Sequence, residues 1–535
     1  MAIHNNTMWE VRTTGSQTNG AGFRWYPIAS SRLQWSPSTA QIGEYYCEHS
    51  SGGDPSLVEA ACCSIGADYA LSTKGTVGSL AVGEWDWGDN DSLGYSTIYV
   101  RIPGNVDPDS GNYATIIAGT SIGYNGGYDY SQQAAAQLSL ADITSDSDGT
   151  TISSDTGGFT ALMISNVMYI SSAGGFTEGW YEIISYIDTN SIIIDRSAGS
   201  SQTGGACNVG GAFSFGGSLD NDFIESCVGG NRIYIGAGTH TLGESVYSST
   251  SGDVDNGIIS HVGYNTIRGD IPTEGDRPLI DCGSSYFYGT SGVCHNALNL
   301  RFTGSGAYVV YFGNYSRLIN CKINNTDTLN DYDALRVDQL TTVIACEIIS
   351  EGNTYSSAIN CYNESSLDGS VTVISCYISG GYYGVNAKFG SVIVNSVIDT
   401  CVYGIFADND QNIKIINNTI YGCTGAGIKG DSILYTQLIN NILTENAIDF
   451  EINSSSAIGT MTFINNCFNG TIPIQYTLGV GEANELYTKP IGCVVEDPGL
   501  ADPSNDDFSI DSDDVYVFQQ GVDVGYLTSA INYTG

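Results

Sequence analysis

Four aspartates lie close together in one stretch of the chain, and their carboxylates are the first candidates for catalysis. Most glycosidases cleave their substrate with a pair of carboxylates, one acting as acid and the other as base or nucleophile. In a chain with 57 Asp and Glu residues, however, such groups also arise in ordinary solvated turns. We therefore expect no catalytic residue here, and the only weak candidates are Asp327, Asp331, Asp333 and Asp338.

A polysaccharide lyase would need a basic group beside the substrate carboxylate. Arg336 and Lys388 are the few candidates in this part of the chain. The whole chain holds 17 basic against 57 acidic residues, a net charge of -40, which repels nucleic acid, anionic membranes and acidic polymers. We exclude nucleic acid and membrane insertion as direct partners. A neutral glycan held by Tyr and Asn side chains fits this composition better than an acidic one.

Asp86, Asp89 and Asp91 are the strongest candidate metal ligands. They offer three carboxylates within a short loop, and calcium accepts oxygen ligands of this kind. The spacing does not match the helix-loop-helix calcium pattern, so an acidic turn is the competing interpretation. No cofactor is expected, and calcium is the one ion left open.

The 15 cysteines predict neither a zinc site nor a disulfide framework. No pair has Cys-x-x-Cys spacing, and only five His are present. We expect most of the thiols to be reduced and buried as small apolar groups, although oxidation of a pair stays open. The N-terminus lacks the basic start and apolar core of a signal peptide, and no apolar run is long enough to span a membrane.

These side chains would be positioned by an internal repeat. A phrase of the type Arg317-Leu-Ile-Asn-Cys-Lys-Ile323 returns every 20 to 30 residues. Between successive phrases stands a small residue followed by an aliphatic one, as in Gly404-Ile405 and Gly427-Ile428. Both segments are short, rich in Ile, Val and Thr, and bounded by turn residues. Units of this length must stack on one another to bury their apolar faces, which predicts an all-β, right-handed parallel β-helix.

One turn position of the repeat should form a structural ladder. If the turns stack in register, identical side chains lie above one another, and a side-chain amide can both donate to and accept from its neighbours. The residues at this position are Cys321, Cys346, Cys376, Ser396, Asn418, Asn441 and Asn466.

Composition and pattern divide the chain into four regions. A short helix at 219–228 should cap the first coil of the solenoid, because its open apolar end needs a cover. Residues 24–128 interrupt an otherwise continuous opening motif and are expected to be an insertion. The predicted regions are a β-rich N-terminal region at 1–128, a β-hairpin region at 129–204, the β-helix at 205–515 and a tail at 516–535.

Three stretches resemble phage and environmental-virus virion proteins built on the pectate-lyase-like β-helix. They are Trp9–Phe23 continued by Asp129–Gln133, Gly263–Asp270 with Asp276–Ile280, and the ending from Asp497 to Gly525. Such proteins serve as tail, tailspike or capsid-appendage components. A shorter stretch, Asn325–Asp327, resembles one element of the galacturonase pattern, but the His-bearing element that should follow is missing.

The resemblance and the composition together predict a non-enzymatic virion structural protein, exposed on the particle for attachment or assembly. Its expected partners are other virion proteins and a host surface glycan, and a homotrimer is favoured by analogy with tailspikes. Assembly in the host cytoplasm would place it in the virion without an export signal. Two alternatives stay open: a tailspike-type depolymerase or lyase acting on a host glycan, and a cellular adhesin.

Overall fold

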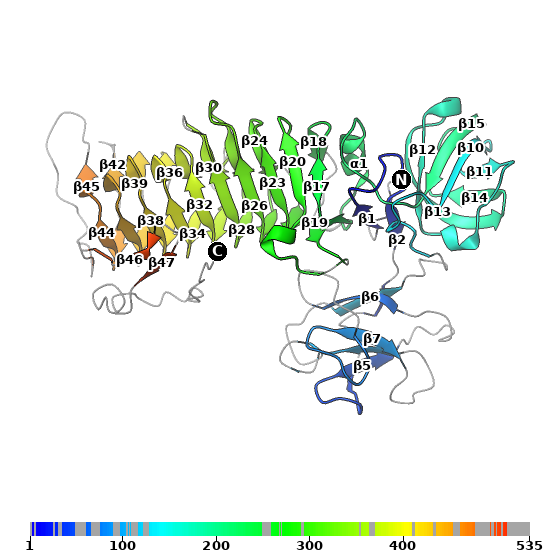
Figure 1. Ribbon diagram of the computed structural model, residues 1–535, viewed down its shortest axis with the longest axis horizontal. Helices are drawn as coiled ribbons and strands as arrows, with labels where there is room; N and C mark the ends of the chain where they lie inside the picture. Colours follow the sequence, from blue (N-terminus) through cyan, green and yellow to red (C-terminus); the bar gives the residue numbers. More distant parts are fainter. Residues whose placement is uncertain are drawn as a thin grey trace. The chain divides into compact units, whose positions relative to one another are not determined.

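The computed structural model is all-β with a parallel β-helix, which confirms the predicted fold class (Figure 1). It describes residues 3–48, 60–65, 75–88, 97–120, 128–248, 258–289, 294–476 and 493–510, apart from short gaps within these ranges. The chain forms two compact units. The N-terminal unit comprises 1–243 and 254–279, and the C-terminal unit comprises 244–253 and 280–535. In the part of the chain that the structure describes, no helix combines the length and apolarity needed to cross a bilayer.

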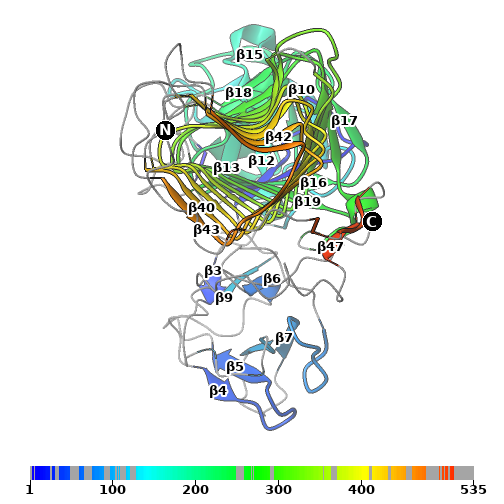
Figure 2. The same cartoon turned by 90° about the vertical axis from the view of Figure 1, so that its left-hand side faces the viewer.

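The C-terminal unit is a solenoid in which each turn contributes one strand to each of three parallel sheets, seen end-on in Figure 2. The first sheet contains β22 (His295–Leu298), β25 (Arg317–Ile319), β28 (Thr342–Ile344), β31 (Thr372–Ile374), β34 (Val392–Val394), β37 (Lys414–Ile416), β40 (Gln437–Ile439) and β43 (Thr462–Ile464). The second contains β20 (Leu279–Gly283), β23 (Arg301–Gly304), β26 (Lys322–Asn325), β29 (Glu347–Ser350), β32 (Tyr377–Gly380), β35 (Val397–Asp399), β38 (Thr419–Tyr421), β41 (Ile442–Thr444) and β44 (Cys467–Asn469). The third contains β18 (Val246–Ser248), β21 (Phe287–Gly289), β24 (Tyr308–Phe312), β27 (Asp333–Val337), β30 (Ser357–Cys361), β33 (Tyr383–Ala387), β36 (Tyr403–Asp408), β39 (Ala426–Asp431), β42 (Ile448–Ile452) and β45 (Ile472–Tyr476).

Each position of the repeated sequence has a fixed role in these turns. Its first aliphatic residue is buried in every turn, as at Leu318, Val343 and Leu438, because it points into the solenoid. The next position but one takes a left-handed conformation, with φ between 50° and 56° in the seven turns from Asn320 to Asn465. Asn tolerates this conformation better than most residues, which accounts for its recurrence there.

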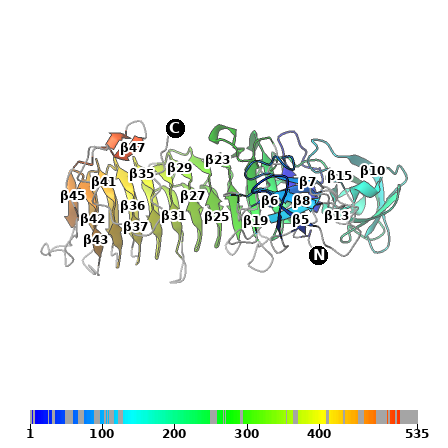
Figure 3. The ribbon, with the colours of Figure 1, turned by 90° about the horizontal axis from the view of Figure 1, so that it is seen from below.

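The described strands depart from the predicted solenoid, 205–515, before its expected end. At the C-terminal side the last parallel strand described is β45, and β46 (Leu500–Asp502) and β47 (Asp507–Ile510) pair antiparallel instead. Phe508 of β47 lies 6.5 Å from Tyr377 and 5.6 Å from Tyr421, so this pair packs against the second sheet (Figure 3). The predicted tail at 516–535 lies outside the described residues.

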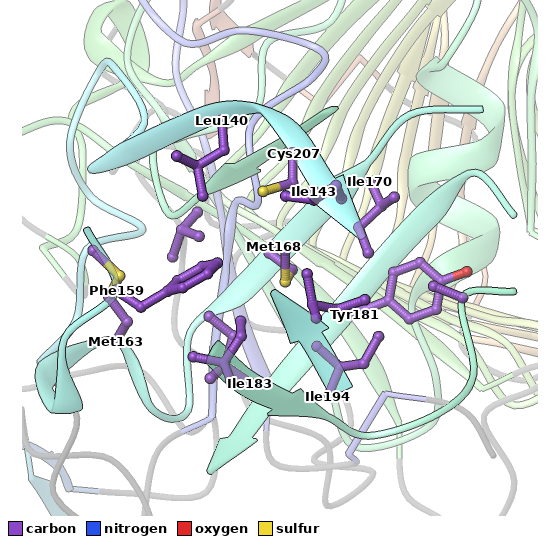
Figure 4. Packing of buried hydrophobic residues seen from close by; sticks show 14 of the residues in the cluster. Leu140, Ile143, Phe159, Met163, Met168, Ile170, Tyr181, Ile183, Ile194 and Cys207 are labelled. Carbon is purple, nitrogen blue, oxygen red and sulfur yellow. The ribbon is translucent and has the colours of Figure 1, made fainter. Parts of the chain in front are cut away.

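The predicted hairpin region proves to be a closed six-stranded antiparallel barrel that reaches past residue 204. Around the barrel the strands are β10 (Leu138–Ser145), β11 (Thr151–Ser154), β14 (Ser191–Ile194), β13 (Gly179–Asp188), β12 (Val167–Ile170) and β15 (Thr203–Val209). β13 and β14 form the hairpin that the sequence indicated, and β15 pairs with both β10 and β12 to close the ring. Phe159, Met168, Ile183 and their neighbours fill the interior (Figure 4).

The opening motif is part of a sheet of the N-terminal unit. β1 (Thr7–Val11) pairs parallel with β16 (Arg232–Gly236) and antiparallel with β2 (Gly22–Arg24), and β16 pairs parallel with β19 (Ile259–Tyr264). The unit also holds β17 (Thr239–Thr241) and the short 3-10 helices η2 (Ala161–Met163), η3 (Ala173–Gly175) and η4 (Glu274–Asp276). The helix expected at 219–228 is α1 (Asp220–Ser226), and its Phe223 packs edge-on against Trp9 of β1 at 5.3 Å.

Arg24 and Tyr128, at the two ends of the predicted insertion, both contact the segment 162–165. The N–H of Arg24 donates to the carbonyl of Ser165, and that of Tyr128 donates to the carbonyl of Leu162. The strands between residues 27 and 120 form two small antiparallel sheets. One sheet contains β3 (Pro27–Ala29), β9 (Ile116–Thr120) and β6 (Ala60–Ile65), and the other contains β4 (Ser36–Pro37), β5 (Tyr45–Glu48), β8 (Thr97–Val100) and β7 (Trp85–Gly88).

Candidate functional site

The four candidate catalytic aspartates all lie on one turn of the solenoid, not on neighbouring turns. Asp327 closes a tight turn, where its carboxylate accepts the N–H groups of Leu329 and Asn330 and the side-chain amide of Asn330. The side-chain hydrogen bond from Asn330 is the main cause that lowers the pKa of Asp327. Asp331 is exposed in the same turn.

Asp333 and Asp338 flank β27 and are both buried. Asp333 accepts the N–H of Ser357 at 2.8 Å and the amide of Asn360 at 2.8 Å, and burial raises its pKa. Asp338 accepts the hydroxyl of Tyr311 at 2.6 Å. Three of the four carboxylates are thus engaged by their own neighbours, and the group does not form an exposed acid–base pair.

The two candidate basic residues, Arg336 and Lys388, also make local contacts. The guanidinium of Arg336 lies 3.3 Å from the ring centre of Tyr362 and 5.1 Å from that of Tyr311. Cation–π contacts of this kind stabilise the guanidinium. Lys388 follows β33, and its backbone N–H donates to the hydroxyl of Ser391.

The predicted metal loop is only partly described. Asp86 lies on β7, where its carboxylate accepts the N–H of Val77 at 2.9 Å. Asp89 and Asp91 lie outside the described residues. Over the ranges that are described, no three His, Cys, Asp or Glu side chains come together as metal ligands.

The predicted ladder is hydrogen-bonded from turn to turn between Cys376 and Asn466. Over this part the N–H of one member donates to the side chain of the next, at 3.2 Å from Cys376 to Ser396, 2.9 Å from Ser396 to Asn418, 3.0 Å from Asn418 to Asn441 and 2.9 Å from Asn441 to Asn466. The amide of Asn441 also donates to the carbonyl of Ile415 at 2.8 Å. At the far end the N–H of Asn466 reaches the sulfur of Cys493. The column satisfies turn groups that burial would otherwise leave unpaired.

Cys321, Cys346 and Cys376 are buried as thiols, and no disulfide joins the cysteines whose side chains the structure describes. Burial strongly raises the pKa of Cys346, which keeps its thiol protonated. The sulfurs of Cys321 and Cys376 contact the carbonyls of Ala297 and Val343.

A second column of stacked side chains was not predicted from the sequence. Cys401, Cys423 and Asn446 stack at the corner after the second sheet, where the N–H of Cys423 donates to the Asn446 side chain at 2.9 Å. The column contributes to the crowding at the small residue of the repeat. A Cβ on Gly384 would come within 2.5 Å of the carbonyl oxygen of Gly404 and 2.9 Å of the Cys401 sulfur, and a Cβ on Gly404 would come within 2.5 Å of the carbonyl oxygen of Gly427 and 3.2 Å of the Cys423 sulfur. The recurring Gly-aliphatic pair was the signal that could have revealed the column.

Aromatic side chains gather on the outside of the third sheet and at its corner with the second sheet. We call Tyr355, Tyr382, Tyr383, Tyr403, Phe406 and Lys429 the Tyr355 cluster. Tyr383 stacks on Phe406 with ring centres 4.5 Å apart, and Tyr382 stands nearly perpendicular to Tyr383 at 4.8 Å. Tyr355 lies 5.0 Å from Tyr382 and is 60% exposed. No sequence motif indicated this cluster, because its members come from four successive turns.

In the N-terminal unit, two of the three stretches with the family resemblance meet in a buried ionic network. Arg268, from the stretch Gly263–Asp270, donates to Glu10 at 2.5 Å, to Asp129 at 2.9 Å and to the hydroxyl of Ser131 at 2.8 Å. Tyr264 donates its hydroxyl to Glu10, and Arg12 donates to Glu10 at 2.6 Å. Burial alone would lower the pKa of Arg268, but the carboxylates of Glu10 and Asp129 outweigh it and raise the pKa.

No family model matches the sequence, and a search of curated proteins finds no match. Solved structures similar to the chain include the A-module of mannuronan C-5 epimerase AlgE6 from Azotobacter vinelandii, with 13% identity and a TM-score of 0.32 over 53% of this chain and 97% of that one. Pectate lyase Pel9A has 15% identity and a TM-score of 0.35 over 49% of this chain and 72% of that one. A tailspike mutant of E. coli bacteriophage HK620, in complex with a pentasaccharide, has 12% identity and a TM-score of 0.33 over 54% of this chain and 65% of that one.

Proposed function

We propose that the chain is a non-enzymatic structural protein of a phage particle, exposed on its surface as a tail, fibre or capsid-appendage component. The observation that carries this proposal is the meeting of Glu10, Asp129 and Arg268 in one buried network. These residues belong to the stretches that resemble virion proteins. Because their charges are used to hold the unit together, the resembling residues serve architecture instead of chemistry.

The solenoid supports the same proposal. Its hydrogen-bonded column joins successive turns, as between Asn418 and Asn441, so the repeat builds a stiff support with polar turns. Among the described candidate acids, Asp333 and Asp338 are buried and engaged by neighbours, an arrangement that suits a structural role better than hydrolysis.

The test uses the full chain and the particles produced by its host. Gold-labelled antibodies against the purified protein should mark intact particles in electron micrographs. Incubating the protein with host surface polysaccharide should release no new reducing ends and no unsaturated products. Native mass spectrometry should show three copies per assembly, since we propose a homotrimer.

Each alternative has its own outcome. Release of cleavage products would replace this proposal with a tailspike-type depolymerase or lyase. Label on cells that carry no phage, with none on particles, would replace it with a cellular adhesin.

A further inference from the structure

Tyr355 occupies a backbone conformation that its side chain disfavours. Its φ is +56°, in the left-handed region, and the side chain is 60% exposed. A bulky residue there is unusual, and such strain often persists where function requires the side chain. Tyr315 and Tyr435 share the conformation, with φ of 59° and 54°, and each is 52% exposed. Only Tyr355 of the three joins the cluster of rings described above.

The rings next to Tyr355 are held in place. Tyr382 contacts Tyr383 at 89° and Tyr403 at 77°, so perpendicular neighbours support its ring. Gly425 leaves the space for Tyr403, because a Cβ there would come within 2.8 Å of the Tyr403 ring. An aromatic surface that is already ordered loses little conformational entropy when it binds a ligand.

The charge of the cluster favours a neutral ligand. Its one cation, Lys429, lies 4.3 Å from the ring centre of Tyr403 and 3.1 Å from the Tyr403 hydroxyl. The ammonium is therefore already used within the cluster, and the chain as a whole carries a net charge of -40. An anionic polymer would be repelled.

We infer that the Tyr355 cluster binds a neutral oligosaccharide, an inference that rests on the proposed exposure of the protein on the particle surface. Sugar rings offer an apolar C–H face that packs on aromatic rings, and hydroxyls that pair with phenol groups. In-register pairing of Tyr383 with Tyr403 repeats the aromatic surface on successive turns, about 4.8 Å apart. A ligand that extends over several turns is therefore an oligosaccharide, and a single sugar would cover only part of the site.

The experiment compares matched tyrosine variants of the full chain on an array of neutral oligosaccharides and their uronate-containing counterparts. The wild-type protein should bind neutral members. Tyr355→Ala and Tyr382→Ala should each weaken binding to the best neutral member about tenfold, the loss expected for one aromatic contact. Tyr315→Ala and Tyr435→Ala remove equally exposed, equally strained tyrosines outside the cluster and should bind like wild type.

Tyr355→Asn separates binding from folding. Asn adopts the left-handed conformation more readily, so this variant should unfold at a higher urea concentration than wild type and still lose binding. The inference is overturned if the array stays empty, if uronate-containing members bind better, or if all the tyrosine variants bind alike. Such a result with gold label still on the particles leaves the proposed function standing, whereas particles without label overturn the proposed function itself.

Discussion

Arg268 and Glu10 are 258 residues apart in the chain, yet the guanidinium Nε donates to the carboxylate Oε2 across 2.5 Å. Both side chains are almost completely withdrawn from solvent. Because the same guanidinium binds Asp129, this one cation links two carboxylates from distant segments. The network thereby joins the opening strand β1, the rejoining point after residue 127 and the segment after β19.

Removing the cation of this network should destabilise the N-terminal unit strongly. Arg268→Ala removes the cation that pairs with Asp129 and leaves the buried carboxylate of Glu10 with Arg12 as its remaining cationic partner, which should cost about 3–5 kcal/mol. Urea unfolding followed by the fluorescence of the buried Trp9 and Trp180 would measure the loss. Arg12→Ala is the control: Arg12 pairs with the same Glu10, but its side chain is 32% exposed, so the loss should be clearly smaller. Equal losses in the two variants would contradict this account.

The ladder makes a separate prediction for the solenoid. Asn441→Ala leaves the N–H of Asn418 and the carbonyl of Ile415 buried without partners, at a cost of about 3 kcal/mol in the free energy of unfolding. Asn441→Cys should lose less, because Cys occupies the same column at Cys321, Cys346 and Cys376. Asn417→Gly is the control at the left-handed position of the preceding turn, where φ is 56° and Gly fits, so the change should be under about 1 kcal/mol. If Asn417→Gly proved as damaging as Asn441→Ala, turn geometry rather than the amide column would dominate.

Asp449 should make the stability of the solenoid depend on pH. Burial raises its pKa from 3.8 to about 7, although hydrogen bonds from Asn446 and the N–H of Gly470 act in the opposite direction. The folded chain therefore holds this proton more tightly than the unfolded chain, and its contribution to stability falls as the pH rises from about 4 to about 7. Below that window both states are protonated, and above it both are ionised.

The comparison is between wild type and Asp449→Asn, measured as urea midpoints across the window. Asn cannot ionise, so the difference between the two proteins should change with pH only between about 4 and 7. A difference that is constant with pH, or one that favours wild type more as the pH rises, would show that Asp449 is ionised in the folded chain.

The stability of the barrel should depend on the packing of its buried core. Phe159→Ala removes a buried ring from the barrel core and should cost about 3–5 kcal/mol. Ile187→Ala, on β13 but 52% exposed, should change the free energy of unfolding by less than about 0.5 kcal/mol. Loss of near-ultraviolet circular dichroism in urea would report both, and a large effect of Ile187→Ala would indicate that its exposed face is covered in solution.

Local pattern was sufficient for the solenoid because every decisive contact there repeats at a short separation. Leu318 and Val343 occupy the same place one turn apart, and the Asn at 440 and 441 serve the turn and the column respectively. Stacking in register follows once each unit must bury its apolar face on the next. The parallel sheets and the column of Asn418, Asn441 and Asn466 could therefore be predicted from the sequence alone.

Tertiary structure alone decided the features that join residues without a common period. Closure of the barrel depends on β15 pairing with both β10 and β12, and the position of Phe508 depends on its packing against Tyr421 of the second sheet. The Tyr355 cluster depends on which side chains share a corner. The same holds for Arg268 and Glu10, whose charges could have paired with many others in so acidic a chain. In a repeat, the spacing along the sequence decides which residues become neighbours. A pairing across 258 residues forms only when the whole chain has folded.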